Sequence, residues 1–145
     1  MPSSDDRNVP YHAFHFVVEI HGIQRGGFRE CSGLDSTTDP VLYREGNDPT
    51  TVRKLAGLTK YSDITLKWGS SDDTELWKWR QNVVDGKVDR QPGSIVLLDE
   101  QGNEKVRWNF TKGWPSKWVG PSLNATATDV AIETLVISHE GVKRQ

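Results

Sequence analysis

Short runs in which apolar and polar residues alternate recur along this chain, and they constrain its fold more than any other feature. In residues 14–20, every second residue is apolar and the intervening ones are mostly polar. Similar alternation appears in residues 64–68 and 106–110. A period of two is typical of half-buried β-strands. The sequence therefore predicts a mainly β fold.

Other segments extend this prediction. Residues 28–32 follow a glycine-rich turn, so we expect them to return as the partner of the first strand. Residues 94–98 form an apolar run typical of a strand buried on both faces, and residues 130–138 carry apolar side chains on both faces, which indicates a central strand. Residues 114–121 are aromatic but irregular. We predict a small β-barrel or sandwich of about six to eight strands.

Residues 72–85 are the only good candidate for a helix. Asp72 can cap its start, and Glu75 stands three residues later, as in a capping box. Gly86 can end the helix in a left-handed conformation. The apolar stripe consists of Leu76, Trp79 and Val83. We predict one outer α-helix that packs on the strands through this stripe.

Residues 35–59 have a different texture, because apolar residues are sparse there. A strand is expected near residues 41–44 and a turn at residues 46–49. Long unstructured loops are uncommon in compact domains unless they are functional or disordered. We predict an extended hairpin arm that is ordered by contact with another subunit. Residues 1–11 are interpreted as a flexible arm, and residues 1–145 as a single domain.

Composition argues against several classes of function. The formal net charge is −2 and both signs are interspersed, unlike the basic surface of a nucleic-acid-binding protein. Residues 1–10 are polar, so we expect neither a signal peptide nor a membrane anchor. Cys31 is the only cysteine, which excludes an intrachain disulfide. A nucleic-acid-binding β-barrel remains an alternative, for which binding should weaken steeply with salt.

Histidines and carboxylates suggest two sites, and neither matches a known motif. His15, Glu19 and His21 alternate on one strand face and could approach a metal, but no fourth ligand is indicated. His139 and Glu140 could form an acid–base pair, but no nucleophile motif accompanies them. No phosphate-binding loop is present either. We expect no metal, no cofactor and no enzymatic activity.

The chain contains six tryptophans. Trp68, Trp79 and Trp108 lie on predicted apolar faces and are expected in the core. The other three are less clear, and tryptophan is enriched at subunit interfaces. We expect an interface role for at least one of these: Trp77, Trp114 and Trp118.

A series of short motifs, in a shared order over about residues 12–142, resembles contractile-tail tube proteins. Each motif is weak alone, and their order is specific. They are GGF at 26–28, SGL at 32–34, YREG at 43–46, KLAGL at 54–58, KYSDITLK at 60–67, LWKW at 76–79, SIVLLD at 94–99, GWPSKW at 113–118, GPSLNA at 120–125, AIETL at 131–135 and HEG at 139–141. Ala56 departs from the family, which often has proline there.

This family includes tail tubes of contractile phages, tubes of extracellular contractile injection systems and, more distantly, the haemolysin-coregulated protein of type VI secretion. The resemblance implies hexameric rings that stack into a hollow tube inside a contractile sheath. The implied partners are further copies, the sheath protein, baseplate and tube-terminating proteins, and luminal cargo protein or DNA, without a membrane. A baseplate tube-initiator or adaptor protein of the same fold is the alternative.

The resemblance also implies where the protein assembles and which roles individual residues have. Assembly is expected in the bacterial or archaeal cytoplasm, as part of an extracellular or cell-associated injection particle or of a virion tail. Inter-subunit contacts are expected from Tyr43, Arg44, Glu45, Leu55 and Leu58. The sheath-facing helix residues are expected to be Glu75, Lys78, Gln81 and Asp85. Candidates for the lumen are His15, Glu19, Asp63 and Lys67.

Overall fold

The computed structural model describes residues 15–21, 23–47, 50–71, 73–126 and 128–145. This part of the chain contains ten strands and one helix, so the mainly β prediction is confirmed with more strands than expected. The predicted flexible arm at residues 1–11 lies outside the described residues. The elements are β1 Phe16–Ile20, β2 Ile23–Arg25, β3 Phe28–Ser32, β4 Ser36–Tyr43, β5 Arg53–Tyr61, β6 Ile64–Gly69, α1 Glu75–Val84, β7 Gln91–Leu98, β8 Glu104–Val119, β9 Ile132–Ser138 and β10 Gly141–Arg144.

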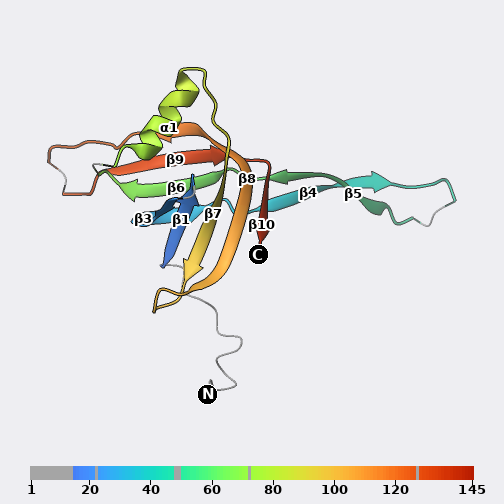
Figure 1. Ribbon diagram of the computed structural model, residues 1–145. Helices are drawn as coiled ribbons and strands as arrows, with labels where there is room; N and C mark the ends of the chain where they lie inside the picture. Colours follow the sequence, from blue (N-terminus) through green and yellow to red (C-terminus); the bar gives the residue numbers. More distant parts are fainter. Residues whose placement is uncertain (1–14, 22, 48–49, 72, 127) are drawn as a thin grey trace, which may run out of the picture.

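Eight strands form one curved antiparallel sheet in the order β2-β1-β7-β8-β9-β6-β3, with β10 also paired to β8 (Figure 1). The long strand β8 pairs with β7 through its first part and with β9 through its last part. Lys112 has a positive φ of 50° close to this change of partner. The sheet therefore divides into two layers. Layer A consists of β2, β1, β7, β10 and the first part of β8, and layer B consists of the last part of β8, β9, β6 and β3.

The two ends of the sheet, β2 and β3, do not pair with each other in the described chain, so the sandwich alternative fits and a closed barrel does not. The prediction that residues 28–32 return onto the first strand is wrong. The short strand β2 pairs with β1, whereas β3 pairs with β6 in the other layer. Gly27, with φ of 80°, lies in the link that carries the chain from layer A to layer B.

The core lies between the two layers and is built from the predicted alternation. Val18 and Ile20 of β1 belong to the same buried cluster as Leu66 of β6 and Leu135 of β9. Successive side chains of a strand point to opposite faces, so the residues between these point away from the core. Ile95 and Val96, in the apolar run at residues 94–98, are both buried, in agreement with a strand covered on both faces. Strand β9 is central in the sheet, as predicted.

The prediction of an irregular segment at 114–121 is wrong for residues 114–119, which continue β8. Pro115 is fully buried there and has no N–H to donate to a neighbouring strand. The pairing with β9 shifts register between Pro115 and Lys117, and bulges are among the few places where a strand accepts proline. Gly113, where β8 changes partner, and Pro115 therefore mark a bend and a bulge within this strand.

Helix α1 closes one end of the sandwich, as the single outer helix predicted (Figure 1). Leu76 and Trp79 are buried in the core, and the indole N–H of Trp79 donates to the carbonyl of Asp89 at 2.8 Å. The helix ends before Gly86, which has φ of 84° as expected. It begins at Glu75, and the predicted cap Asp72 lies outside the described residues. Among the described residues, no helix combines the length and apolarity needed to cross a bilayer.

Candidate assembly surfaces

Strands β4 and β5 form a separate two-stranded sheet that projects from one side of the body, and this is the predicted arm (Figure 1). It spans residues 36–61, so it begins one residue later and ends two residues later than the predicted 35–59. The two strands pair with each other and with no further strand in the described chain. Their large apolar residues are exposed, and they are Val41, Leu42, Tyr43, Leu55, Leu58 and Tyr61.

Local contacts shape the arm. The hydroxyl groups of Thr38 and Thr59 are hydrogen-bonded across the strands at 2.9 Å, and Lys60 pairs with Asp39 at 3.2 Å. The register shifts between Thr38 and Pro40. Next to this bulge Gly57 is tightly placed, because an added Cβ would lie 2.7 Å from the carbonyl oxygen of Asp39. These contacts hold the two strands together and leave both faces of the hairpin open.

The base of the arm is attached to the body through His139. Its Nε2 lies 2.8 Å from the carbonyl oxygen of Ser62, and its Nδ1 accepts a hydrogen bond from the N–H of Gly141 at 3.1 Å. The ring also lies between Tyr61 and Phe110, with centroid distances of 5.9 and 6.1 Å. Both ring nitrogens are engaged with backbone, so His139 has a structural place beneath the arm.

All five residues predicted to contact other subunits are exposed. Tyr43, Leu55 and Leu58 lie on the strands of the arm, and Arg44 and Glu45 lie in the connection that follows β4. The Tyr43 hydroxyl donates to Glu45 at 2.7 Å, and this bond raises the pKa of Tyr43. Sequence reasoning missed Val41 and Leu42, which are also exposed apolar residues. Their exposure could have been anticipated from the low apolar content of residues 35–59, which leaves no core to cover them.

The predicted sheath-facing residues lie on the solvent side of α1, with Glu75, Lys78 and Asp85 exposed and Gln81 half-buried. The Gln81 amide donates to Asp85 at 3.3 Å. One flank of the helix is apolar rather than charged. Val84 and Trp77 lie there, with the Trp77 side chain 48% exposed. The predicted charged face therefore borders an apolar strip.

Trp77 belongs to a chain of aromatic rings that runs inward from this strip. It meets Trp118 edge to face at 5.1 Å, Trp118 meets Trp68 at 5.3 Å, and Trp68 meets Phe28 at 5.8 Å. Edge-to-face packing at such distances is favourable beyond area burial. Of the three tryptophans considered for interfaces, Trp77 is the exposed one, and Trp114 and Trp118 are partly buried.

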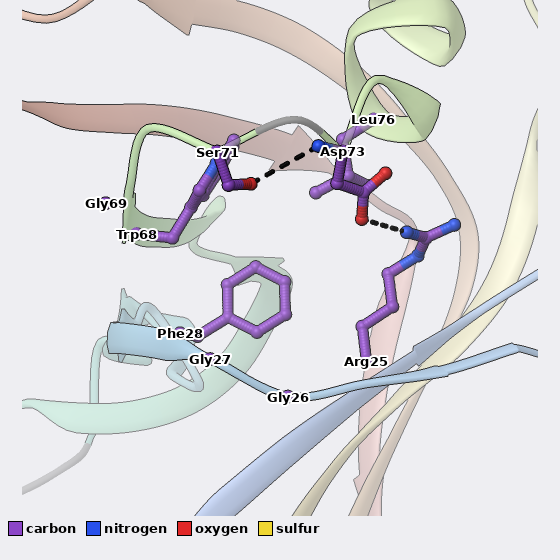
Figure 2. A pocket seen from close by; sticks show the side chains of 9 residues that line it. All are labelled: Arg25, Gly26, Gly27, Phe28, Trp68, Gly69, Ser71, Asp73 and Leu76. Carbon is purple, nitrogen blue, oxygen red and sulfur yellow. Dashed lines mark hydrogen bonds and ion pairs between the residues drawn. The ribbon is translucent and has the colours of Figure 1, made fainter.

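A small pocket of about 180 Å³ lies between β2, β3 and the start of α1 (Figure 2). Arg25 crosses its side and pairs with Asp73 at 2.7 Å and with Glu75 at 3.4 Å. Asp73, one residue before the N-cap Thr74, also accepts the N–H of Glu75 at 3.0 Å. This cluster joins the first turn of the helix to the edge strand β2.

The lumen candidates His15 and Glu19 fall on layer A, on the face turned away from the core. Arg107 on β8 donates to Glu19 and to Glu104 there. The bond from Arg107 lowers the pKa of Glu19 and, in return, raises that of Arg107. Beside them, Ser94 donates to Asn109 at 2.6 Å. The charges of Glu19, Arg107 and Glu104 are paired on this face, and the buried Val96 lies among these polar residues.

The other lumen candidates, Asp63 and Lys67, belong to layer B. Lys67 pairs with Glu30 at 3.7 Å, on the face opposite to the buried Leu66. Because the two layers enclose one core, their outward faces point in opposite directions. The two sets of lumen candidates therefore lie on opposite sides of the subunit.

The proposed metal trio is divided in the structure. His21 has φ of 58° and packs against Trp79 at 5.1 Å, whereas Glu19 pairs with Arg107. No group of three possible metal ligands occurs within the described ranges. Glu140, the other half of the acid–base pair considered, lies 3.4 Å from Lys112.

A family model described as T4-like virus tail tube protein gp19 matches residues 12–143. A comparison with curated proteins found no match. Among solved structures, a chain of the sheath–tube complex of PVC, an extracellular contractile injection system in the extended state, shares 26% identity. The TM-score is 0.88, over 100% of this chain and 99% of that chain.

Two further structures widen the comparison. A chain from the tube terminating cap of the anti-feeding prophage AFP shares 26% identity with a TM-score of 0.86, over 95% of this chain and 92% of that one. Hcp1 from Flavobacterium johnsoniae shares 18% identity with a TM-score of 0.53, over 89% and 93% of the two chains. The likeness to Hcp1 is one of fold alone.

Proposed function

Because this chain belongs to the T4-like virus tail tube protein gp19 family and is a structural subunit of an inner tube, we propose that its copies stack as hexameric rings around a hollow lumen. The observation that carries this proposal is the arm of β4 and β5. An isolated two-stranded hairpin is marginally stable in water. This one exposes apolar side chains on both faces, and we propose that neighbouring copies cover them.

We propose that Tyr43, Arg44, Glu45, Leu55 and Leu58 contact other subunits through the arm. The arm projects from one side of the body, and the loop between β8 and β9 projects from the opposite side (Figure 1). A contact between two different surfaces of identical chains is heterologous. Such contacts generate closed rings or open filaments, which are the two levels of order in a stacked tube.

The charged face of α1, with Glu75, Lys78, Gln81 and Asp85, is proposed to meet the contractile sheath. Exposed ion pairs contribute little to stability, so a polar contact can be released when a sheath contracts. The similar structures come from a sheath–tube complex and a tube terminating cap, which supports sheath and terminating proteins as partners. A baseplate protein is proposed as a further partner. The proposed setting is assembly in the cytoplasm, followed by function in an injection particle or virion tail.

We propose that the outward face of one layer lines the lumen, where protein cargo or DNA would pass. The candidates are Glu19 of layer A and Lys67 of layer B. A large polyethylene-glycol maleimide added to sheath-free tubes should modify a cysteine on the outside and spare one in the lumen. Glu19→Cys and Lys67→Cys, each in a Cys31→Ser background, should therefore differ in labelling, and equal labelling would contradict a single lumen-facing layer.

The function proposed is structural, without a catalytic centre. Its test is deletion of residues 46–57, which removes the connection between the two strands and the start of β5 with Leu55, and leaves Ser36–Thr38 paired with Thr59–Tyr61. The purified deletion variant should keep the circular dichroism spectrum of a folded β protein and form no tubes by negative-stain microscopy. Normal tubes from this variant would refute the role of the arm. Single rings from the intact protein, without stacking, would favour a tube-initiator or adaptor.

A further inference from the structure

An apolar groove opens at the point where the curved sheet fails to close. It has a volume of about 330 Å³ and lies between the edge strand β3 and the core-facing side of layer A. Arg29 and Glu30 of β3 stand among its lining residues and supply its charge. The apolar residues that line it are Phe16, Cys31, Leu34, Ile95, Leu97 and Trp108.

Strand β3 offers this groove an unpaired backbone edge. It pairs with β6 on one side and, within the described residues, with no strand on the other. An open edge presents N–H and C=O groups that can accept a further strand. Beside such an edge, an apolar groove can take alternate side chains of the added strand, which is how β-strand addition obtains its specificity.

Cys31, one of the residues that line the groove, stays uncharged because it is largely buried. The pKa of Cys31 is raised to about 12, mainly by burial and further by the nearby Glu30. The thiol is therefore neutral at physiological pH and behaves as a small apolar side chain. An apolar side chain matches this part of the lining, and a basic side chain matches Glu30 beside it.

The arm contains a strand that can supply such side chains, because β5 carries Leu55 and Leu58 together with the basic residues Arg53, Lys54 and Lys60. β5 has nine residues and no proline, whereas β4 contains Pro40, which removes one N–H from its edge. Leu58 of β5 is 76% exposed. Because Thr59 and Ala56 pair with Thr38 and Pro40, which lie two residues apart on β4, the bulge places Ala56 on the face of Thr59. Leu58 lies on the opposite face, together with Leu55, which is directly opposite Val41.

We infer that β5 of one copy adds to the free edge of β3 of a neighbouring copy and places Leu58 in the groove beside Cys31. This inference rests on the proposed tube assembly and specifies where the arm binds. Each copy then carries the inserting strand on its arm and the receiving edge on its body. The arm of each copy begins directly after Leu34, which lines the groove. The copy's own arm and the arm of the neighbour that binds in its groove therefore lie next to each other.

Two measurements test this on the full chain. First, the backbone amides of residues 28–34 should exchange hydrogen for deuterium at least about tenfold more slowly in wild-type tubes than in dissociated subunits, because an added strand bonds them. Second, tubes of Leu58→Cys should give disulfide-linked chains on copper-phenanthroline oxidation, and mass spectrometry should find peptides in which the introduced thiol is joined to Cys31. Leu58→Cys combined with Cys31→Ser should remove these links, and Lys78→Cys on α1 should not form them.

Unchanged exchange at residues 28–34 in wild-type tubes would overturn the inference and leave the tube function standing. Slower exchange without a Cys31 link from Leu58→Cys, or from Leu55→Cys on the same face of β5, would overturn β5 as the occupant. Should Leu58→Cys fail to assemble, Leu55→Cys and the wild-type exchange measurement decide the question. Absence of tubes from the wild-type protein would overturn both the inference and the proposed function.

Discussion

Arg107 on β8 donates two hydrogen bonds to the carboxylate of Glu19 on β1, across the strand β7 that lies between them. The longer of these joins Nη2 to Oε1 at 3.3 Å. Arg107 also donates to Glu104 of its own strand. One side chain therefore ties β8 to β1 over the intervening strand on the outward face of layer A.

Replacing Glu19 with glutamine should lower the stability of the unassembled subunit by about 0.5–1 kcal/mol at pH 7. The pKa of Glu19 is lowered from its ordinary 4.5. A carboxyl group with a lowered folded-state pKa stabilises the fold above its unfolded-state pKa, and this stabilisation is lost as the pH falls through the folded-state value. Urea unfolding of both proteins at several pH values should show the difference shrink in acid. A difference independent of pH would argue against the ion pair.

Replacing Gly93 with alanine should destabilise the subunit by about 1–3 kcal/mol through overpacking. An added Cβ would lie 2.2 Å from Cζ of Phe110, a fully buried ring. The smaller side chain of Phe110→Leu should relieve this clash, so the double variant should be more stable than the sum of the single effects predicts. Urea midpoints of the four proteins measure the coupling, and simple additivity would contradict the contact.

Replacing Asp73 with alanine should destabilise the subunit by about 1–2 kcal/mol, because a first-turn N–H loses its acceptor, as it does on loss of a helix cap. The change removes the acceptor for the Glu75 N–H and one partner of Arg25, whose side chain is only 11% exposed. Asp73→Asn retains an oxygen acceptor and should lose less. Thermal unfolding of the three proteins checks the order, and equal losses would show that the cap has no part.

Replacing Leu58 with aspartate should abolish tubes and leave the stability of the subunit within about 0.5 kcal/mol of wild type. The side chain is exposed in the single subunit, so its change costs little there, and a charge in an apolar interface is costly. Leu58→Met keeps an apolar side chain and should form tubes. Sedimentation and microscopy at matched concentration make the comparison, and normal tubes from the aspartate variant would exclude an apolar contact at this position.

Alternation predicted the strands that line the core because burial depends on which face each side chain occupies. Val18, Leu66 and Leu135 could be assigned to a core in this way. Pairing partners could not be, since alternation does not say which strands are neighbours. Residues 28–32 were therefore given the wrong partner, although their strand character was right.

The arm was predicted from its low content of apolar residues. Too few apolar residues around Val41 and Leu55 predicted a segment without a core of its own, and the extended hairpin is confirmed. The continuation of β8 beyond Gly113 was missed because proline usually indicates the end of a strand. The bulge that accommodates Pro115 depends on the register with β9, which no local pattern reveals.

Strand β8 belongs to both layers of the sandwich, with residues up to Gly113 bonded to β7 and residues from Trp114 bonded to β9. A force applied to one layer therefore reaches the other along the covalent backbone. The two layers cannot shear past each other unless β8 straightens at its bend (Figure 1). Under compression along the axis of a tube, the two layers of each subunit would therefore deform together.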